Sequence, residues 1–222
     1  MVWVIQRLSS LRSHPPVGVA QLWIVRPRMP HGLMLPFDGS AFVIWGGDTP
    51  ELNHHHAHPV QRYAFDFTTV PSVAGAQRHV NSEDKNEDFL IFGRTILCPL
   101  DGVVVEAVDG LRDNRPRQMN ERMVSGNFVL IKHSNSVFMH LSHLKCGSVL
   151  VRAGAVVKRG EVLAACGNSG RSTEPHLHFH VQSDDRIGNP KGLKCWFEKV
   201  RVAREVKHDY SPVRGDIVEN VA

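Results

Sequence analysis

Glycine, proline and aspartate interrupt the chain about every eight to fifteen residues, and this feature restricts its fold more than any other. Between these breaks apolar and polar residues alternate, as in residues 101–110 and 175–183, and no amphipathic helix runs for more than about two turns. Residues 126–134 and 136–144 flank a short Ser-Asn turn, which predicts a β-hairpin. We therefore expect residues 90–183 to be all β.

The composition of the chain changes toward its two ends. Residues 1–35 are rich in Pro and Arg and hold two Trp-containing apolar patches, which predicts an N-terminal arm or an extra strand. Residues 36–205 form the predicted domain, and residues 206–222 a C-terminal tail. With 222 residues, one core is the simplest expectation. The predicted fold is mainly β, an antiparallel sheet or barrel-sandwich-like single domain with long loops and few short helices.

Composition and charge exclude several classes of protein. Hydrophobic residues make up 42% and charged residues 22%, which is typical of globular chains. No apolar run approaches the roughly 18 residues of a membrane-spanning helix, and the N-terminus lacks the order expected of a signal peptide. The net charge is +4, but acids lie among the basic residues, so we expect no nucleic-acid partner. The four cysteines form no CxxC pair, which favours small buried thiols.

Histidine is unusually frequent, with fourteen residues, and ten of them fall into three clusters within residues 54–58, 133–143 and 176–180. Imidazole is the commonest metal ligand in proteins and the usual general base near neutral pH. Three clusters so far apart in sequence predict a site that is assembled from distant strands.

The alternation in residues 175–183 places His176, His178 and His180 on one face of a strand, with apolar residues on the other. A His-x-His pair on a strand can place both imidazoles on one metal, or one on the metal and one beside it. The glycine-rich segment 167–175 comes directly before this strand, where we expect it to leave space for a substrate backbone.

Two further segments hold candidate site residues. Asp66 lies in an aromatic strand, where a carboxylate is uncommon unless it is paired, for example with Arg62, or ligates a metal; the nearby histidines favour a metal. His140 follows an apolar triplet on a strand that looks interior, where a hydrogen-bonded core histidine is the default. Polar neighbours predict that His133 and His143 are surface residues.

Taken together, these segments resemble the M23 family of zinc metallopeptidases, the lysostaphin/LytM-type peptidoglycan endopeptidases. The resemblance runs in order from about Gly39 to Val181. Its most specific parts are the Ser-Thr-x-Pro-His-Leu-His-Phe string at residues 172–179 and the His-Leu pair at residues 140–141. The resemblance implies an M23-like fold and one zinc ion per chain.

The resemblance also implies the metal ligands. The second histidine of the His-x-His pair, His178, and the aspartate that precedes it in the chain, Asp66, match the family pattern. The usual His-x-x-x-Asp spacing is absent. A subgroup with Asn-x-His followed by Gln-Arg-Tyr-Ala-x-Asp matches better and places His55 in the ligand position, with His56 and His58 as competitors.

The catalytic residues that the resemblance implies are His140 and His176, either of which could be the general base. Three protein ligands leave one position of a tetrahedral zinc open, which is typical of a catalytic site. No HExxH motif is present to supply a glutamate base. Glu174 stands where many family members have glycine, a change that we expect to affect subsite shape more than chemistry.

The implied function is a zinc-dependent endopeptidase that cleaves peptide crosslinks or bridges of bacterial peptidoglycan, with a stem peptide or crossbridge as its substrate. The residues do not separate Gly-Gly bonds from D-amino-acid crosslinks. The alternative is a non-catalytic LytM-like module that binds and activates other wall hydrolases. A biotinyl/lipoyl-type carrier would need an exposed lysine at a hairpin tip, and none is present. A cupin would need a glutamate a few residues after the His-x-His pair, where this sequence offers only Asp184 and Asp185. We expect a monomer that acts in the cell envelope or outside the cell.

Overall fold

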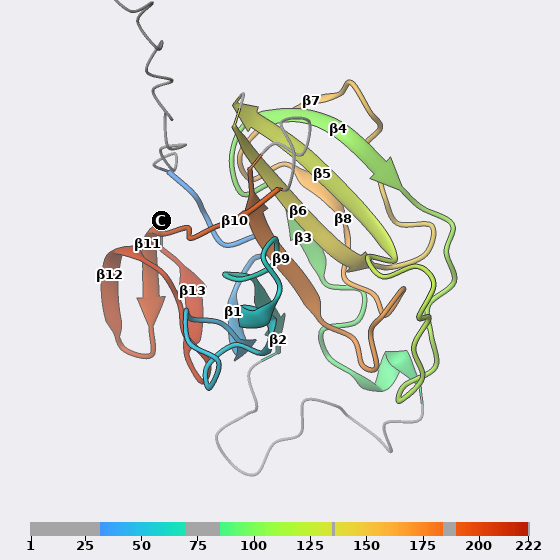
Figure 1. Ribbon diagram of the computed structural model, residues 1–222, viewed down its shortest axis with the longest axis horizontal. Coiled ribbons are helices and arrows are strands. Elements are labelled where there is room, and N and C mark those ends of the chain that lie inside the picture. The colour runs from blue at the N-terminus through green and yellow to red at the C-terminus, as the bar shows by residue number, and fades with distance from the viewer. Residues whose placement is uncertain (1–31, 70–84, 135, 184–189, 222) are drawn as a thin grey trace, which may run out of the picture.

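A computed structural model describes residues 32–69, 85–134, 136–183 and 190–221, and within them almost all regular structure is β (Figure 1). The two helices of this part are single 3-10 turns, η1 (His54–Ala57) and η2 (Asn86–Asp88). The strands are β1 (Ser40–Trp45), β2 (Phe65–Thr68), β3 (Thr95–Leu97), β4 (Gly102–Val108), β5 (Asn127–Ser134), β6 (Val137–Leu144), β7 (Val156–Val157), β8 (Val162–Ala165), β9 (Leu177–Gln182), β10 (Gly192–Leu193), β11 (Phe197–Val202), β12 (Glu205–Tyr210) and β13 (Ile217–Asn220).

Most strands join one large antiparallel sheet with the order β12-β11-β13-β1-β2-β9-β6-β5-β4-β7, in which β10 also pairs with β9. The strands β3 and β8 form a separate two-stranded sheet. Figure 1 shows β5, β6 and β9 side by side, with β3 and β8 behind them. The predicted mainly β fold is confirmed, and so is the predicted hairpin, which is the pair of β5 and β6.

The core lies on one face of the large sheet, where the period of two in the sequence collects the apolar side chains. Phe65 on β2 and Phe179 on β9 are fully buried and stack at a centroid distance of 6.4 Å. Met139 on β6 and Ile96 on β3 belong to the same buried cluster. Burial of each such side chain stabilises the fold by about 1.5–3 kcal/mol. The residues between these apolar positions point to the other face, which holds the site.

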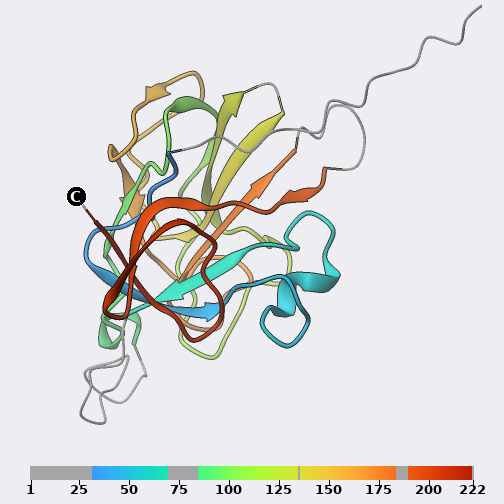
Figure 2. The same ribbon diagram turned by 90° about the vertical axis from the view of Figure 1, so that its left-hand side faces the viewer.

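The chain is also built into the sheet beyond both predicted domain limits. Leu33 and Leu35 are fully buried, and Leu33 forms a bridge with Phe197. At the other end, β12 and β13 lie mostly in the segment for which we expected a tail, and β13 pairs with both β1 and β11 (Figure 2). The division into 1–35, 36–205 and 206–222 stays a prediction, and residues 1–31 lie outside the described part.

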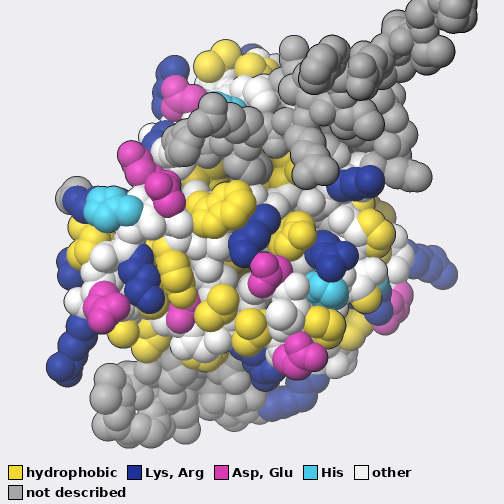
Figure 3. All heavy atoms as spheres, turned by 60° about the vertical axis from the view of Figure 1, so that its left-hand side comes forward, with side chains coloured by type: hydrophobic (Ala, Val, Ile, Leu, Met, Phe, Trp, Pro, Cys, Tyr) yellow, Lys and Arg dark blue, Asp and Glu magenta, His cyan; other side chains and the backbone are white. Residues whose placement is uncertain are grey.

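The cysteines and surface charges follow the sequence expectations. Cys98, Cys166 and Cys195 are buried free thiols, and burial raises the pKa of Cys98 and Cys195 to about 12. On the face drawn in Figure 3, basic, acidic and apolar side chains are interspersed, without a basic stripe among the described residues. Among the same residues, no helix has the length and hydropathy needed to cross a membrane.

Candidate metal centre

The centre is built on the pairing of β2 with β9. Asp66 and His178 lie opposite each other in the antiparallel register, so their side chains emerge next to each other from the same face. The distance between His178 Nδ1 and Asp66 Oδ1 is 2.9 Å. Both residues are almost completely buried. These two residues, 112 positions apart in sequence, are therefore neighbours because of the sheet register.

A capped 3-10 turn brings a third donor to this pair. Asn53 caps η1: its side-chain oxygen accepts a hydrogen bond from the His55 backbone N–H, and its amide donates to the carbonyls of Gly47 and Ala64. The turn is thereby held against the start of β2. It places His55 Nε2 3.0 Å from Asp66 Oδ2. The sequence-predicted ligands His55, Asp66 and His178 therefore meet in one place.

His54, which the sequence analysis did not single out, lies at the same centre. Its Nε2 atom is 2.9 Å from His55 Nε2 and 3.5 Å from Asp66 Oδ2. The ring stacks on Trp45 with centroids 4.7 Å apart, and the side chain is half exposed. His54, His55 and Asp66 form the compact donor group that could hold a metal ion.

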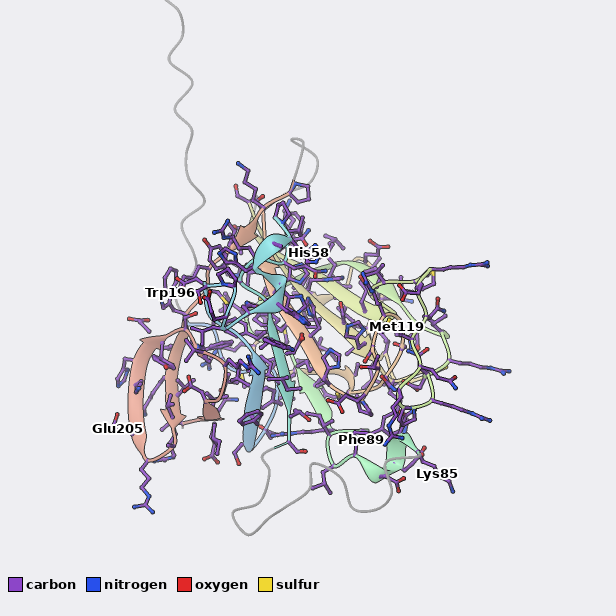
Figure 4. All side chains as sticks on the ribbon, turned by 60° about the horizontal axis from the view of Figure 1, so that its bottom comes forward. His58, Lys85, Phe89, Met119, Trp196 and Glu205 are labelled. Carbon is purple, nitrogen blue, oxygen red and sulfur yellow. The ribbon has the colours of Figure 1, made fainter. Side chains whose placement is uncertain are left out.

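The two competitors of His55 lie differently. His56 Nε2 accepts a hydrogen bond of 2.8 Å from the guanidinium of Arg62, which holds its ring away from the centre. His58 lines the pocket around the centre, and Figure 4 labels it on the segment between β1 and β2. Neither ring has a described contact with Asp66, so the geometry favours His55.

The electrostatics suit a cation. Burial by itself would raise the pKa of the Asp66 carboxyl, but the neighbouring imidazoles of His176, His55 and His178 outweigh it and hold the pKa well below its usual range. Burial also lowers the pKa of His178 well below its usual value. A tetrahedral zinc with bonds of about 2.0–2.1 Å separates its ligand atoms by about 3.3 Å. The His55 and His178 nitrogens lie 3.0 and 2.9 Å from different oxygens of the Asp66 carboxylate, which is shorter than this ligand separation. The donor types, imidazole nitrogens and a carboxylate, are those that zinc binds.

His176 stands directly before β9 and turns one nitrogen to the centre. Its Nδ1 atom donates to the backbone carbonyl of Glu174 at 2.8 Å, and Ser172 Oγ lies 3.2 Å from the same nitrogen. In a neutral ring with the proton on Nδ1, Nε2 keeps its lone pair. His176 Nε2 is 3.8 Å from Asp66 Oδ1, so this lone pair faces the centre.

His143 also reaches the centre, and the prediction that it is a surface residue is wrong. The register between β5 and β6 shifts at this end of the strands, and His143 adopts a left-handed backbone with φ of 62°. Such a bulge turns a side chain away from the regular alternation. The His143 ring lies 4.8 Å from His176 and 5.8 Å from His178.

The surroundings of His143 define its protonation. Its Nδ1 atom donates to the carbonyl of Ser169 at 2.8 Å, which leaves the Nε2 lone pair free. Burial and the neighbouring His176 lower the pKa of His143 to about 3, so the ring is neutral at pH 7. His143 therefore presents the same kind of acceptor as His176.

His140, the residue that the resemblance pointed to, lies outside the pocket. It is half buried, and its ring contacts Phe128 and His180 at centroid distances of 4.9 Å. His140 shares a sheet face with His178, but it pairs with His180, two residues further along β9. A signal for His143 is present in the sequence, because residues 143–144 form a second His-Leu pair directly after the first.

The residues of the centre line an open cavity of about 680 Å³. One wall comes from the β1–β2 connection and the other from the loop before β5, on which Figure 4 labels Met119. Arg171 and Glu174, which carry opposite charges, lie on the segment before β9 and line the cavity. The cavity is lined by Ile44, Trp45, His54, His55, His58, Pro59, Val60, Gln61, Asp66, Met119, Val124, Ser125, Ser142, His143, Arg171, Ser172, Thr173, Glu174, His176 and His178.

The glycines before β9 lie where neighbouring segments of the chain approach each other closely. Gly170 has a φ of 78° and packs its backbone directly against Gly126, where a Cβ atom would not fit. Gly167 packs in the same way against Lys145. These glycines permit close contact with neighbouring segments, while residues 171–174 of the same segment line the cavity. The expected space for a substrate backbone stays a prediction.

The sheet and the centre define a class of protein: a β domain in which two imidazoles lie beside a carboxylate–imidazole donor set of the kind that binds metals. Residues 87–190 match the family Peptidase family M23, the family that the sequence resembles. The matched segment contains His143, His176 and His178. It begins after Asp66, so the placement of His55 and Asp66 rests on the structure.

The relatives carry related names. Over 115 residues the chain is 34% identical to an "Uncharacterized metalloprotease" of Buchnera aphidicola subsp. Baizongia pistaciae, covering 51% of this chain and 27% of that protein. Over 89 residues it is 37% identical to "Peptidoglycan DD-endopeptidase ShyA" of Vibrio cholerae, covering 40% of this chain and 17% of that protein. A solved zinc-containing peptidase from Vibrio cholerae aligns with a TM-score of 0.45 and 23% identity over 74% of this chain and 39% of that one. The matches span about a quarter or less of these curated relatives.

Proposed function

We propose that this chain is a zinc-dependent endopeptidase that cleaves peptide crosslinks or bridges of bacterial peptidoglycan. The main support is the meeting, in one pocket, of a buried carboxylate with two imidazole donors and two further imidazoles that present Nε2. Several relatives are named peptidoglycan DD-endopeptidases, which supports this substrate class.

His55, Asp66 and His178 would hold the zinc ion, through Nε2, the carboxylate and Nδ1. A zinc ion bound there supplies Lewis acidity for attack of water on a peptide carbonyl. Half-exposed His54 lies within the same donor group, where it can approach or leave without unfolding the core.

His143 and His176 would handle the protons of the reaction. Each ring keeps its Nδ1 proton in a hydrogen bond to a backbone carbonyl, so each Nε2 atom can accept a proton from the attacking water. The ring that has accepted this proton can then deliver it to the leaving amine, after which its Nε2 atom again holds a lone pair. We assign to His143 the role for which the resemblance had indicated His140, because only His143 lines the pocket.

Zinc content and hydrolysis, measured on the same preparations, test the proposal. The protein should bind one zinc per chain and release soluble fragments from purified peptidoglycan. Asp66→Ala should lose both properties, because it removes the carboxylate between the imidazoles. Asp101→Ala, which changes an exposed acid outside the pocket, is the matched control and should keep both.

The outcomes separate the two functions. A protein that binds stoichiometric zinc but releases no fragments would instead be the non-catalytic module. A protein in which Asp66→Ala keeps full zinc occupancy would show that the ligand assignment is wrong.

A further inference from the structure

A row of hydrogen bonds continues from the centre along β9, away from the pocket. His178, His180 and Gln182 are alternate residues of this strand, so their side chains share one face. His178 Nε2 lies 3.0 Å from His180 Nδ1, and His180 Nε2 lies 2.9 Å from Gln182 Oε1. His180 is 2% exposed, so water does not replace either partner. The mechanism proposed above uses neither His180 nor Gln182.

Gln182, at the end of this row, indicates which atom donates the proton in each hydrogen bond. The structure turns the Gln182 side-chain oxygen toward His180 Nε2; in this orientation the oxygen accepts and His180 Nε2 donates. The Nδ1 atom of a neutral His180 then holds a lone pair and accepts the Nε2 proton of His178. His178 in turn is left with its lone pair on Nδ1.

This lone pair points at an acceptor. His178 Nδ1 lies 2.9 Å from the Asp66 carboxylate, which also offers only lone pairs. Two lone pairs at this distance repel unless a cation or an additional proton lies between them. The hydrogen bonds from Gln182 therefore prepare His178 Nδ1 as a metal donor.

We propose that His180, supported by Gln182, is a positioning residue that sets the tautomer and ring orientation of His178 for metal binding. The inference rests on the metal site of the proposed function. Replacement of a residue that hydrogen-bonds to a metal-binding histidine commonly lowers metal affinity about 10–100-fold. His180 is not among the residues that line the pocket, so its effect passes through His178.

The test measures zinc affinity of the metal-free protein by competition with a chromophoric chelator. His180→Leu removes the acceptor and should weaken zinc binding about 10–100-fold, without lowering the melting temperature of the metal-free protein. His180→Glu restores an acceptor for the His178 Nε2 proton and should recover most of the affinity. His133→Leu removes an imidazole on β5 whose contact is the Asp101 carbonyl, and it should bind zinc like the wild type.

A second readout follows the tautomer directly. Long-range ¹H–¹⁵N spectra of the zinc-loaded wild type should show His178 with its proton on Nε2, and the Co²⁺-substituted His180→Leu variant should show an altered visible spectrum. If His180→Leu does not fold, Gln182→Leu takes its place and should yield a mixture of His178 tautomers.

The outcomes distinguish the inference from the proposed function. A wild type without zinc affinity would overturn the metal site itself. A wild type that binds zinc, together with His180→Leu of equal affinity or Gln182→Leu with an unchanged tautomer, would overturn the role of His180 alone.

Discussion

Replacement of His143 is the perturbation that most sharply tests the assignment of the catalytic histidines. We choose His143→Asn, because asparagine tolerates the left-handed backbone with φ of 62° and can still hydrogen-bond to Ser169. The variant lacks the imidazole ring whose centroid lies 4.8 Å from that of His176, and with it the Nε2 lone pair. Zinc content should remain at one per chain, because His143 is not among the proposed ligands.

The expected loss of hydrolysis rate in His143→Asn can be estimated from the proposed role of His143. A general base or an oxyanion donor contributes about 10²–10⁴-fold to the rate, which corresponds to about 3–5 kcal/mol of transition-state stabilisation. Release of soluble fragments from purified peptidoglycan at saturating zinc measures this loss. Melting temperature, recorded on the same preparation, shows whether the fold is kept.

The matched control is His140→Asn, on the same strand and three residues earlier. Its ring contacts Phe128 and His180 and lies outside the pocket, so hydrolysis should stay near the wild-type rate. The opposite pattern, an active His143→Asn and an inactive, zinc-loaded His140→Asn, would refute the reasoning from geometry. It would return the role to the residue that the sequence resemblance indicated.

Three further predictions concern the ligands, pH and thiols. His55→Ala should lower zinc affinity, whereas His56→Ala should not, as measured by chelator competition; equal effects would contradict the choice of His55. Burial lowers the pKa of His143 to about 3, from about 6.5 in an unfolded chain. Between about pH 3 and pH 6.5 the unfolded state therefore binds more protons than the folded state. Above about pH 6.5 the metal-free protein should keep the full contribution of neutral His143 to its stability, and this contribution should be lost as the pH falls toward about 3. A melting temperature that does not change with pH over this range would contradict this prediction. Cys98 should resist alkylation in the native state, whereas the less buried Cys146 should react, as mass spectrometry of labelled protein would show.

Much of the site could be predicted because β-strands alternate strictly. The period of two places His178 and Asp66 on the face opposite the aromatic core, and the structure places both there. The pairing of their strands could not be derived from alternation, since it depends on the order of strands in the whole sheet. The family resemblance supplied that information instead.

His143 shows where alternation fails. Read as a regular strand, residues 137–144 place His140 on the site face and His143 on the core face. An extra residue at the register shift and the positive φ of His143 reverse this assignment. A bulge depends on contacts with the neighbouring strand, so the local pattern does not contain it. His54 was missed for a related reason, because a 3-10 turn, not a strand, directs it to the centre.

The central claim, hydrolysis of peptidoglycan peptide bonds at this centre, is tested most directly by digestion of purified sacculi, with the released muropeptides identified by mass. The zinc-loaded protein should release fragments that differ from the intact crosslinked muropeptides by the water added at one peptide bond. Asp66→Ala should release none. Sacculi that remain intact with the zinc-loaded wild-type protein, or equal release by Asp66→Ala, would contradict the account.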